Sequence, residues 1–202
     1  MPKFGPRYKV PFRRKREGKT DYRKRLKLLK SGKPRLVARV SANRVQAMIS
    51  KASSIGDYTL VHVTSEHLKR YGWKGGTKNT PAAYLVGYLC GKQALQRGIT
   101  EAVLDIGRHA ARKGARVFAV LKGALDAGLQ IPHEDSVLPG EDRIAGRHIV
   151  EYAKKLKQKS EEYQKRFSQY LSRGLPPEEL EVHFMTVKDQ IMRGGSQDET
   201  SG

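Results

Sequence analysis

A short stretch of the sequence combines a carboxylate, two glycines and a cluster of cations. Asp105 ends a short apolar run, and residues 107–116 read Gly-Arg-His-Ala-Ala-Arg-Lys-Gly-Ala-Arg before a helical pattern begins. Open α/β sheets commonly bind ligands where their strands end, and helix N-terminal amides and guanidinium groups hold phosphate. This spacing indicates phosphate binding, with a solvated loop as the alternative. The candidate contacts are Arg108, His109, Arg112, Lys113 and Arg116.

The amino-terminal 35 residues form a second cationic segment. They contain fifteen Lys and Arg residues and two Asp and Glu residues, in a chain whose net charge is +20. Proline and glycine at positions 2, 5, 6 and 11 oppose a helix and favour an extended path. Cations displace counterions from phosphates and aromatic rings stack on unpaired bases, so this composition predicts an RNA-binding arm; a solubilising tail or a localisation signal is the alternative. The candidate contacts are Phe4, Arg7, Tyr8, Lys9, Phe12, Arg13, Arg14, Lys15, Arg16, Lys19, Tyr22, Arg23, Arg25 and Arg35.

Two further loops carry candidate contacts. One is a predicted tight turn that follows residue 41, and the other reads Gly-Trp-Lys-Gly-Gly-Thr-Lys at 72–78. A flexible cationic loop either wraps phosphate or stays solvated, and the sequence leaves both open. The candidates in these loops are Asn43, Arg44, Trp73, Lys74 and Lys78.

Motifs for nucleotide hydrolysis and for nuclease chemistry are incomplete. Gly18-Lys19-Thr20 ends like a phosphate-binding loop, but Arg13 stands where that motif needs its first glycine. A two-metal nuclease needs several carboxylates that converge on its strands, and of Asp57, Asp105 and Asp126 only Asp105 ends a predicted strand. We therefore predict no catalytic residue, no metal site and no cofactor. An RNA-processing nuclease that uses the same sheet is the alternative function.

The remaining composition narrows the class of protein. The six histidines lack the spacing of a compact metal-ligand pair, and the single cysteine, Cys90, stands among apolar helix positions and is predicted to be a buried small hydrophobe. No apolar run approaches the roughly 18 residues of a membrane span, and the first residues lack the apolar core of a signal peptide. We expect a cytoplasmic protein with no membrane partner and no small-molecule substrate.

These candidates need a scaffold, and the apolar spacing predicts an α/β fold. From residue 36 apolar residues recur at every second position, which predicts an antiparallel meander of three strands. Helical spacing follows Thr80, the expected cap, with Pro81 at the first helical position. The expected fold is a mixed sheet with packed helices. The predicted elements are an arm helix capped by Thr20 and ending at Gly32, strands at 36–40, 45–49 and 58–63, a helix at 80–95, a strand at 102–106, a helix at 116–127 and a brief strand at 129–131.

Beyond Glu141 the pattern becomes helical and the charge becomes balanced, with nine Lys and Arg residues and nine Asp and Glu residues in 151–202. An aromatic stripe from Tyr152 to Tyr170 predicts one long charged helix, and a second helix that starts at Pro176-Pro177 and continues to Ile191 is expected to pair with it as a hairpin. The predicted organisation is a basic arm and helix at 1–34, an α/β domain at 35–150, a helical carboxy-terminal extension at 151–193 and a disordered tail at 194–202.

Several motifs in combination resemble those of archaeal-type large-subunit ribosomal protein eighteen, a 5S rRNA-binding family whose eukaryotic counterpart is ribosomal protein five. The resemblance runs from about Phe12 to Tyr152. The motifs are Phe-Arg-Arg-Lys-Arg-Glu-Gly-Lys-Thr-Asp-Tyr-Arg-Lys-Arg-Leu at 12–26, Lys-Pro-Arg-Leu-Val at 33–37, Tyr-Gly-Trp-Lys-Gly at 71–75, Asn-Thr-Pro-Ala-Ala-Tyr-Leu at 79–85, Glu-Ala-Val-Leu-Asp-Ile-Gly at 101–107, Arg-Val-Phe-Ala at 116–119, Lys-Gly-Ala-Leu-Asp-Ala-Gly at 122–128 and Ile-Pro-His at 131–133.

The resemblance implies a ribonuclease-H-like fold of the translational-component type without nuclease activity. It also implies that the protein binds 5S rRNA and attaches it to the large-subunit rRNA in the central protuberance. Its neighbours there would be other ribosomal proteins, including the second 5S-binding protein, ribosomal protein five of the bacterial nomenclature. The family pattern reads Ser-Asn-Arg or Ser-Asn-Lys in the meander turn, whereas Ser41-Ala42-Asn43-Arg44 contains an additional alanine.

Overall fold

A mixed four-stranded sheet forms the centre of the molecule. The computed structural model describes residues 5 and 7–194, so Phe4 and the predicted tail beyond Gly194 lie outside the described residues. Strands β1 (Arg35–Val40), β2 (Val45–Ala52) and β3 (Asp57–Thr64) form the antiparallel meander, and β4 (Val103–Asp105) pairs in parallel with β1. The strand order is β3-β2-β1-β4, which confirms the predicted mixed α/β sheet.

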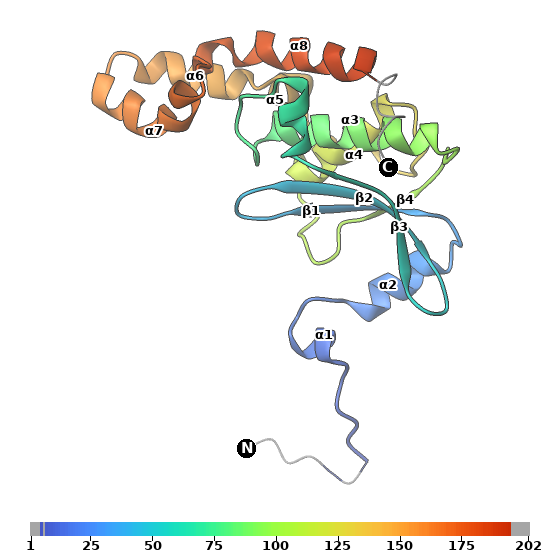
Figure 1. Ribbon diagram of the computed structural model, residues 1–202. Helices are drawn as coiled ribbons and strands as arrows, with labels where there is room; N and C mark the ends of the chain where they lie inside the picture. The colour runs from blue at the N-terminus through green and yellow to red at the C-terminus, as the bar shows by residue number, and fades with distance from the viewer. Residues whose placement is uncertain (1–4, 6, 195–202) are drawn as a thin grey trace.

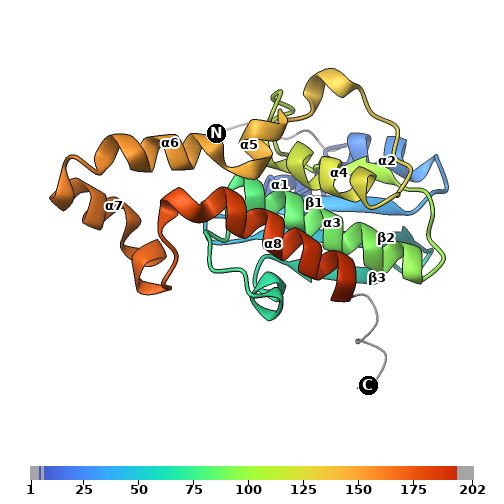
Figure 2. The ribbon, with the colours of Figure 1, turned by 90° about the horizontal axis from the view of Figure 1, so that it is seen from above.

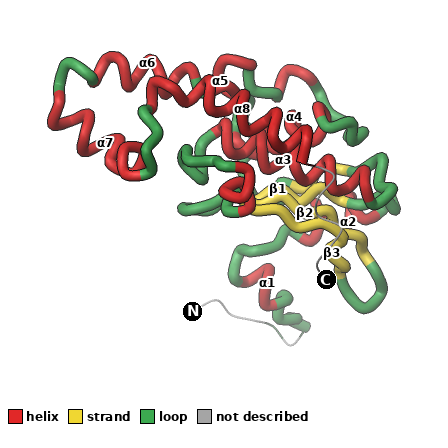
Figure 3. The backbone as a smooth tube through the Cα atoms, turned by 45° about the horizontal axis from the view of Figure 1, so that its top comes forward, coloured by secondary structure: helices red, strands yellow, loops and turns green. Residues whose placement is uncertain are grey.

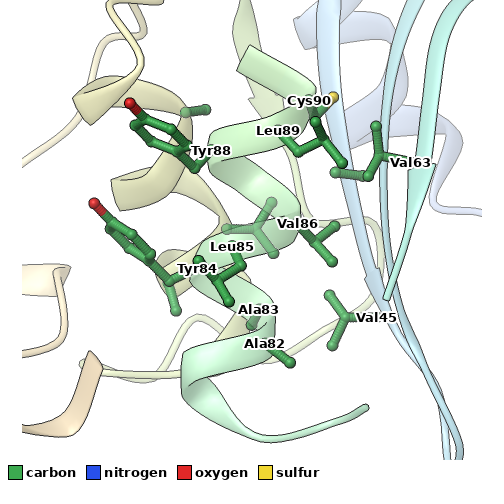
Figure 4. Close-up of a cluster of buried hydrophobic side chains, with 14 of the residues drawn as sticks. Val45, Val63, Ala82, Ala83, Tyr84, Leu85, Val86, Tyr88, Leu89 and Cys90 are labelled. Carbon is green, nitrogen blue, oxygen red and sulfur yellow. The ribbon is translucent and has the colours of Figure 1, made fainter. Parts of the chain in front are cut away.

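Two helices, α3 (Thr80–Gln96) and α4 (Arg116–Asp126), cover one face of the sheet (Figure 1). The alternation in β1 directs Leu36 and Ala38 to this face, where both are fully buried. Val86 on α3 lies toward the sheet residues Val45 and Val63 (Figure 4). Cys90 belongs to the same cluster, and burial raises the pKa of its thiol to about 12. The prediction of a buried cysteine is confirmed.

Glycines allow α3 and α4 to pack closely. A Cβ atom on Gly87 would collide with the backbone of Val120, and one on Gly123 would collide with the backbone of Tyr84. Because the obstructing atoms are backbone atoms, a side chain at either glycine would force the two helices apart.

The amino-terminal arm crosses the opposite face of the sheet (Figures 1 and 3). It contains the single turn α1 (Arg13–Arg16), a break at Gly18, and the longer helix α2 (Tyr22–Leu29). The expectation of an extended path is therefore wrong for residues 13–16. The predicted cap of α2 is displaced by one residue, because the Asp21 carboxylate accepts the backbone N–H groups of Arg23 and Lys24.

Two more predictions need small corrections. Asn79 rather than Thr80 caps α3, since its side-chain oxygen accepts the backbone N–H of Ala82 at 2.9 Å, and Pro81 lies in the first turn, where a missing N–H costs nothing. The brief strand expected at 129–131 is a single bridge between Glu101 and Gln130.

The described residues after Gly140 form four helices. Three short 3₁₀ turns occur in the described chain, two before these helices and one between the last two of them. The helices are α5 (Glu141–Ala145), α6 (Arg147–Leu156), α7 (Ser160–Ser172) and α8 (Leu180–Arg193), and the 3₁₀ turns are η1 (His67–Tyr71), η2 (Asp135–Val137) and η3 (Pro177–Glu179). None of the helices within the described ranges is long and apolar enough to span a membrane.

The prediction of one long helix across 152–170 is wrong. The chain leaves α6 at Lys157 and returns as α7, so these two helices form a hairpin (Figure 2). A small separate cluster of Ala153, Leu156 and Phe167 holds this hairpin together. Helix α8 does not pair with a long helix as expected but lies along α3 (Figure 2), and its inward stripe joins the main core. That stripe consists of Leu180, Phe184, Val187 and Ile191.

Candidate nucleic-acid interface

Three loops that carry predicted contacts meet at one end of the sheet. Strands β1, β3 and β4 end there and β2 begins there. The Thr77 hydroxyl donates a hydrogen bond to the carbonyl oxygen of Asn43 at 2.6 Å, and the Arg116 guanidinium donates one to the carbonyl oxygen of Lys78 at 2.8 Å. These bonds fasten the meander turn, the loop at 72–79 and the start of α4 to one another. The structure therefore brings the separate loop candidates into one surface.

The loop between β4 and α4, residues 106–115, is braced by Asp105 just before it and by His109 within it. The Asp105 carboxylate accepts the backbone N–H of Gly107 at 2.8 Å. The Nε2 atom of His109 accepts the backbone N–H of Val40 at 3.2 Å, and burial, followed by the charges of Arg39 and Arg116, lowers the pKa of this imidazole. His109 thus acts as a brace for the loop.

The cationic side chains of this loop remain exposed, and one of them meets the arm. Arg108, Arg112, Lys113 and Arg116 are exposed. A Cβ atom on Gly18 would lie 3.6 Å from the Arg108 guanidinium, and backbone hydrogen bonds, then the charges of Lys24 and Arg108, lower the pKa of Asp21. The loop after β4 lies below the sheet, on the side of α1 and α2 (Figure 1). Arm and loop consequently form one continuous cationic surface.

Most candidate side chains of the arm are exposed. Phe12 is 73% exposed and its ring centroid lies 5.3 Å from that of the half-buried Tyr22. A phenylalanine this exposed has no core to fill, and its ring face is accessible to a base. The other exposed candidates in the arm are Arg7, Tyr8, Lys9, Arg13, Arg14, Lys15, Arg16, Lys19 and Arg23, while Arg25 is half-buried.

Two predicted contacts lie inside the protein. The side chain of Arg35 is 2% exposed, and it donates to Asp57 at 2.7 Å and to Asp105 at 2.9 Å. Trp73 is 4% exposed, its ring stacks on His183 with centroids 5.2 Å apart, and its indole N–H donates to the carbonyl oxygen of Gly76. Because neither side chain reaches the surface, we leave Arg35 and Trp73 out of the interface.

Sequence reasoning missed a groove between α2 and the open face of the sheet. Its volume is about 1070 Å³, and its floor is apolar at Val37 and Met48 while Lys24, Lys27 and Arg39 contribute cations. The period of two along β1 provides the signal that could have found Arg39, because it places this residue on the same face as Val37.

The structure offers the nuclease alternative no support. Asp105 is buried and engaged by Arg35 and Arg39, and Asp57 is engaged by Arg25 and Arg35. Within residues 5 and 7–194 no cluster of three or more His, Cys, Asp or Glu residues could hold a metal ion. The arrangement can bind polyanions through fixed cations and exposed rings.

Comparisons with known proteins agree with this chemistry. The family model described as "Ribosomal large subunit proteins 60S L5, and 50S L18" matches residues 6–101 and 96–134. A protein of Methanothermobacter thermautotrophicus is 58% identical over 187 residues, which cover 93% of this chain and 96% of the relative. Proteins of Thermofilum pendens and Caldivirga maquilingensis are each 55% identical over 188 residues, covering 93% and 92% of this chain and 96% and 91% of the relatives. All three are called "Large ribosomal subunit protein uL18".

Proposed function

The chain belongs to the family of ribosomal large-subunit proteins described as 60S L5 and 50S L18, and from this premise we propose that it binds 5S rRNA and attaches it to the large-subunit rRNA in the central protuberance. The family consists of structural, non-enzymatic components of the large subunit, so the chain is a structural component of cytoplasmic ribosomes. The resemblance that the motifs indicated is thereby confirmed at the level of the family.

The observation that carries the proposal is the continuity of the cationic surface. The arm, with a net charge of +13 over residues 1–35 by its fifteen basic and two acidic residues, meets the loop after β4 at Gly18 and Arg108. An RNA that neutralises one of these segments therefore also lies against the other. Continuous cationic surfaces of this kind are expected to release many counterions on binding RNA.

The segments of the surface have different tasks in this proposal. The arm neutralises phosphates and offers exposed rings to unpaired bases. The loop after β4 is braced at His109 and presents Arg108, Arg112 and Lys113 from a fixed backbone, which suits recognition of RNA shape through phosphates and 2′-hydroxyls. The sheet and its helices hold these segments in place and perform no chemistry.

The partners that we propose are 5S rRNA, the adjoining large-subunit rRNA and neighbouring ribosomal proteins, among them the second 5S-binding protein. Crosslinking in purified large subunits, followed by mapping of crosslinked peptides to nucleotides, tests this proposal. We expect peptides from the arm and from residues 106–116 to crosslink to 5S rRNA. Crosslinks of these peptides to other rRNA alone would contradict it.

A further inference from the structure

A chain of ion pairs crosses the open face of the sheet and reaches the arm. The Arg25 guanidinium of α2 contacts the Asp57 carboxylate at 2.7 Å, and Arg35 contacts the other Asp57 oxygen at 2.7 Å. Arg35 also contacts Asp105 at 2.9 Å, which in turn contacts Arg39 at 3.0 Å. The chain thus links an arm helix to β3, β1 and β4 in succession.

Besides this ion pair, only partial side-chain contacts hold α2, whose residues Tyr22, Leu28 and Leu29 are half-buried. None of its side chains is buried, and Leu26 is 57% exposed. A helix of eight residues is marginal in water without tertiary contacts. Within the described residues, the ion pair between Arg25 and Asp57 is the one salt bridge that α2 forms, and it joins the helix to β3.

We propose that Asp57 is the anchor of the arm: it holds α2 on the open face before RNA arrives, and in this way a negatively charged residue strengthens the binding of a polyanion. This inference rests on the proposed RNA-binding function. Asp57 is a positioning residue that acts through Arg25 and needs no contact with RNA.

Several features of Asp57 suit it to this role. Its side chain is 31% exposed, and the Arg35 side chain on its other flank is 2% exposed, so the ion pair is only partly screened by solvent. The hydrogen bond from Arg25, then that from Arg35, lowers the pKa of Asp57, so the carboxylate stays ionised. Because α2 is already held in place, RNA binding does not include the loss of conformational entropy that ordering a free segment would require.

A purely electrostatic role of Asp57 predicts that removal of its negative charge strengthens RNA binding, which is the opposite of what an anchoring role predicts. Replacing Asp57 by asparagine raises the net charge of the protein by one, and added positive charge strengthens binding to nucleic acid. If Asp57 merely opposes the RNA, Asp57→Asn therefore binds more tightly than the wild type. If Asp57 anchors α2, the same variant binds more weakly, so the two accounts differ in sign.

The matched control is Asp189→Asn, which causes the same change in charge. Asp189 is an exposed residue of α8 that forms no ion pair or side-chain hydrogen bond within the described part of the chain, and α8 and α2 lie on opposite sides of the sheet (Figure 1). With the full-length chain and 5S rRNA at fixed salt, we expect Asp57→Asn to weaken binding by about five- to tenfold. Asp189→Asn should stay within about twofold of the wild type. Equal or tighter binding by Asp57→Asn would overturn the proposal.

A second pair of variants removes one cation each from α2 and leaves Arg35 undisturbed. Arg25→Gln breaks the anchor, whereas Lys27→Gln, on the same helix, retains it. Hydrogen exchange of the free full-length chain measures the protection of the α2 amides without RNA. We expect faster exchange of residues 22–29 in Arg25→Gln and in Asp57→Asn, and wild-type exchange in Lys27→Gln. Unchanged exchange in the first two variants would overturn the anchor.

The two measurements separate failure of the anchor from failure of the proposed function. If wild-type protein shows no preference for 5S rRNA, the proposed function fails, while the exchange experiment still tests the anchor. A thermal melt of each variant verifies that the body is folded, and Arg25→Gln supplies the test if Asp57→Asn unfolds.

Discussion

The imidazole Nε2 of His109 accepts the backbone N–H of Val40 across the gap between the loop after β4 and the end of β1, at 3.2 Å. This bond requires an unprotonated Nε2 atom. The loop that presents Arg108 is therefore held by a bond that is lost when the imidazole gains a second proton.

The bond predicts that acid weakens the fold at this loop. Burial is the main cause that lowers the pKa of His109 from 6.5 in the folded protein. The stability that this neutral imidazole contributes is therefore fully present above pH 6.5, decreases as the pH falls below 6.5, and is lost below the folded-state pKa. We expect amides in residues 106–115 to exchange faster at about pH 5 than at about pH 7.5, after correction for intrinsic exchange rates. His109→Ala should reduce this difference; an unchanged difference would contradict the role of the bond.

Binding to RNA should depend steeply on salt. If about eight phosphates are neutralised, the slope of log affinity against log salt concentration is about −6 to −7. Titrations of 5S rRNA at several salt concentrations measure this slope directly. A slope shallower than about −2 would refute binding through a broad cationic surface.

Reversal of charge at Arg108 should weaken 5S rRNA binding by about tenfold or more, equivalent to about 1.4 kcal/mol. The residue lies where the loop and the arm meet, so Arg108→Glu affects both segments. Lys165→Glu on α7 is the control, because Lys165 is exposed and stands in a region where Lys and Arg balance Asp and Glu. Equal losses in the two variants would remove the case for a localised interface.

The close approach of α3 and α4 predicts a strong effect of a single methyl group. Gly87→Ala should destabilise the fold by about 1–3 kcal/mol, because its Cβ collides with the backbone of Val120 and cannot be relieved by a rotamer change. Gly56→Ala, with open space around its Cβ, should change the free energy of unfolding by less than about 0.5 kcal/mol. Denaturant unfolding of both variants is the measurement, and similar values would contradict the packing.

The sequence predicted the sheet and its two covering helices because local patterns specify them. Alternating apolar residues in β1 and Pro81, two residues after Asn79, are visible without any long-range information. The sequence of α3 also contains a signal for the position of α8. Helix α3 is apolar on almost all sides, with Tyr84 and Tyr88 buried away from the sheet (Figure 4), and such a helix needs a second covering layer.

The errors in the predicted site have a different origin. The charge of Arg35 predicts a contact with RNA, but in the fold this side chain pairs with Asp57 and Asp105, which follow it by 22 and 70 residues. The ring of Trp73 likewise predicts stacking on a base, but in the fold it stacks on His183. Both errors concern pairs of residues far apart in the sequence, and one sequence contains no direct information about such pairs.

The central claim is that the arm and the loop after β4 recognise a folded ribosomal RNA and do more than attract negative charge. A competition measurement at physiological salt tests it most directly, with 5S rRNA and a synthetic polyanion of equal charge density competing for the full-length chain. Specific recognition predicts a preference for 5S rRNA of about a thousandfold or more. Equal affinity for the two competitors would contradict the claim.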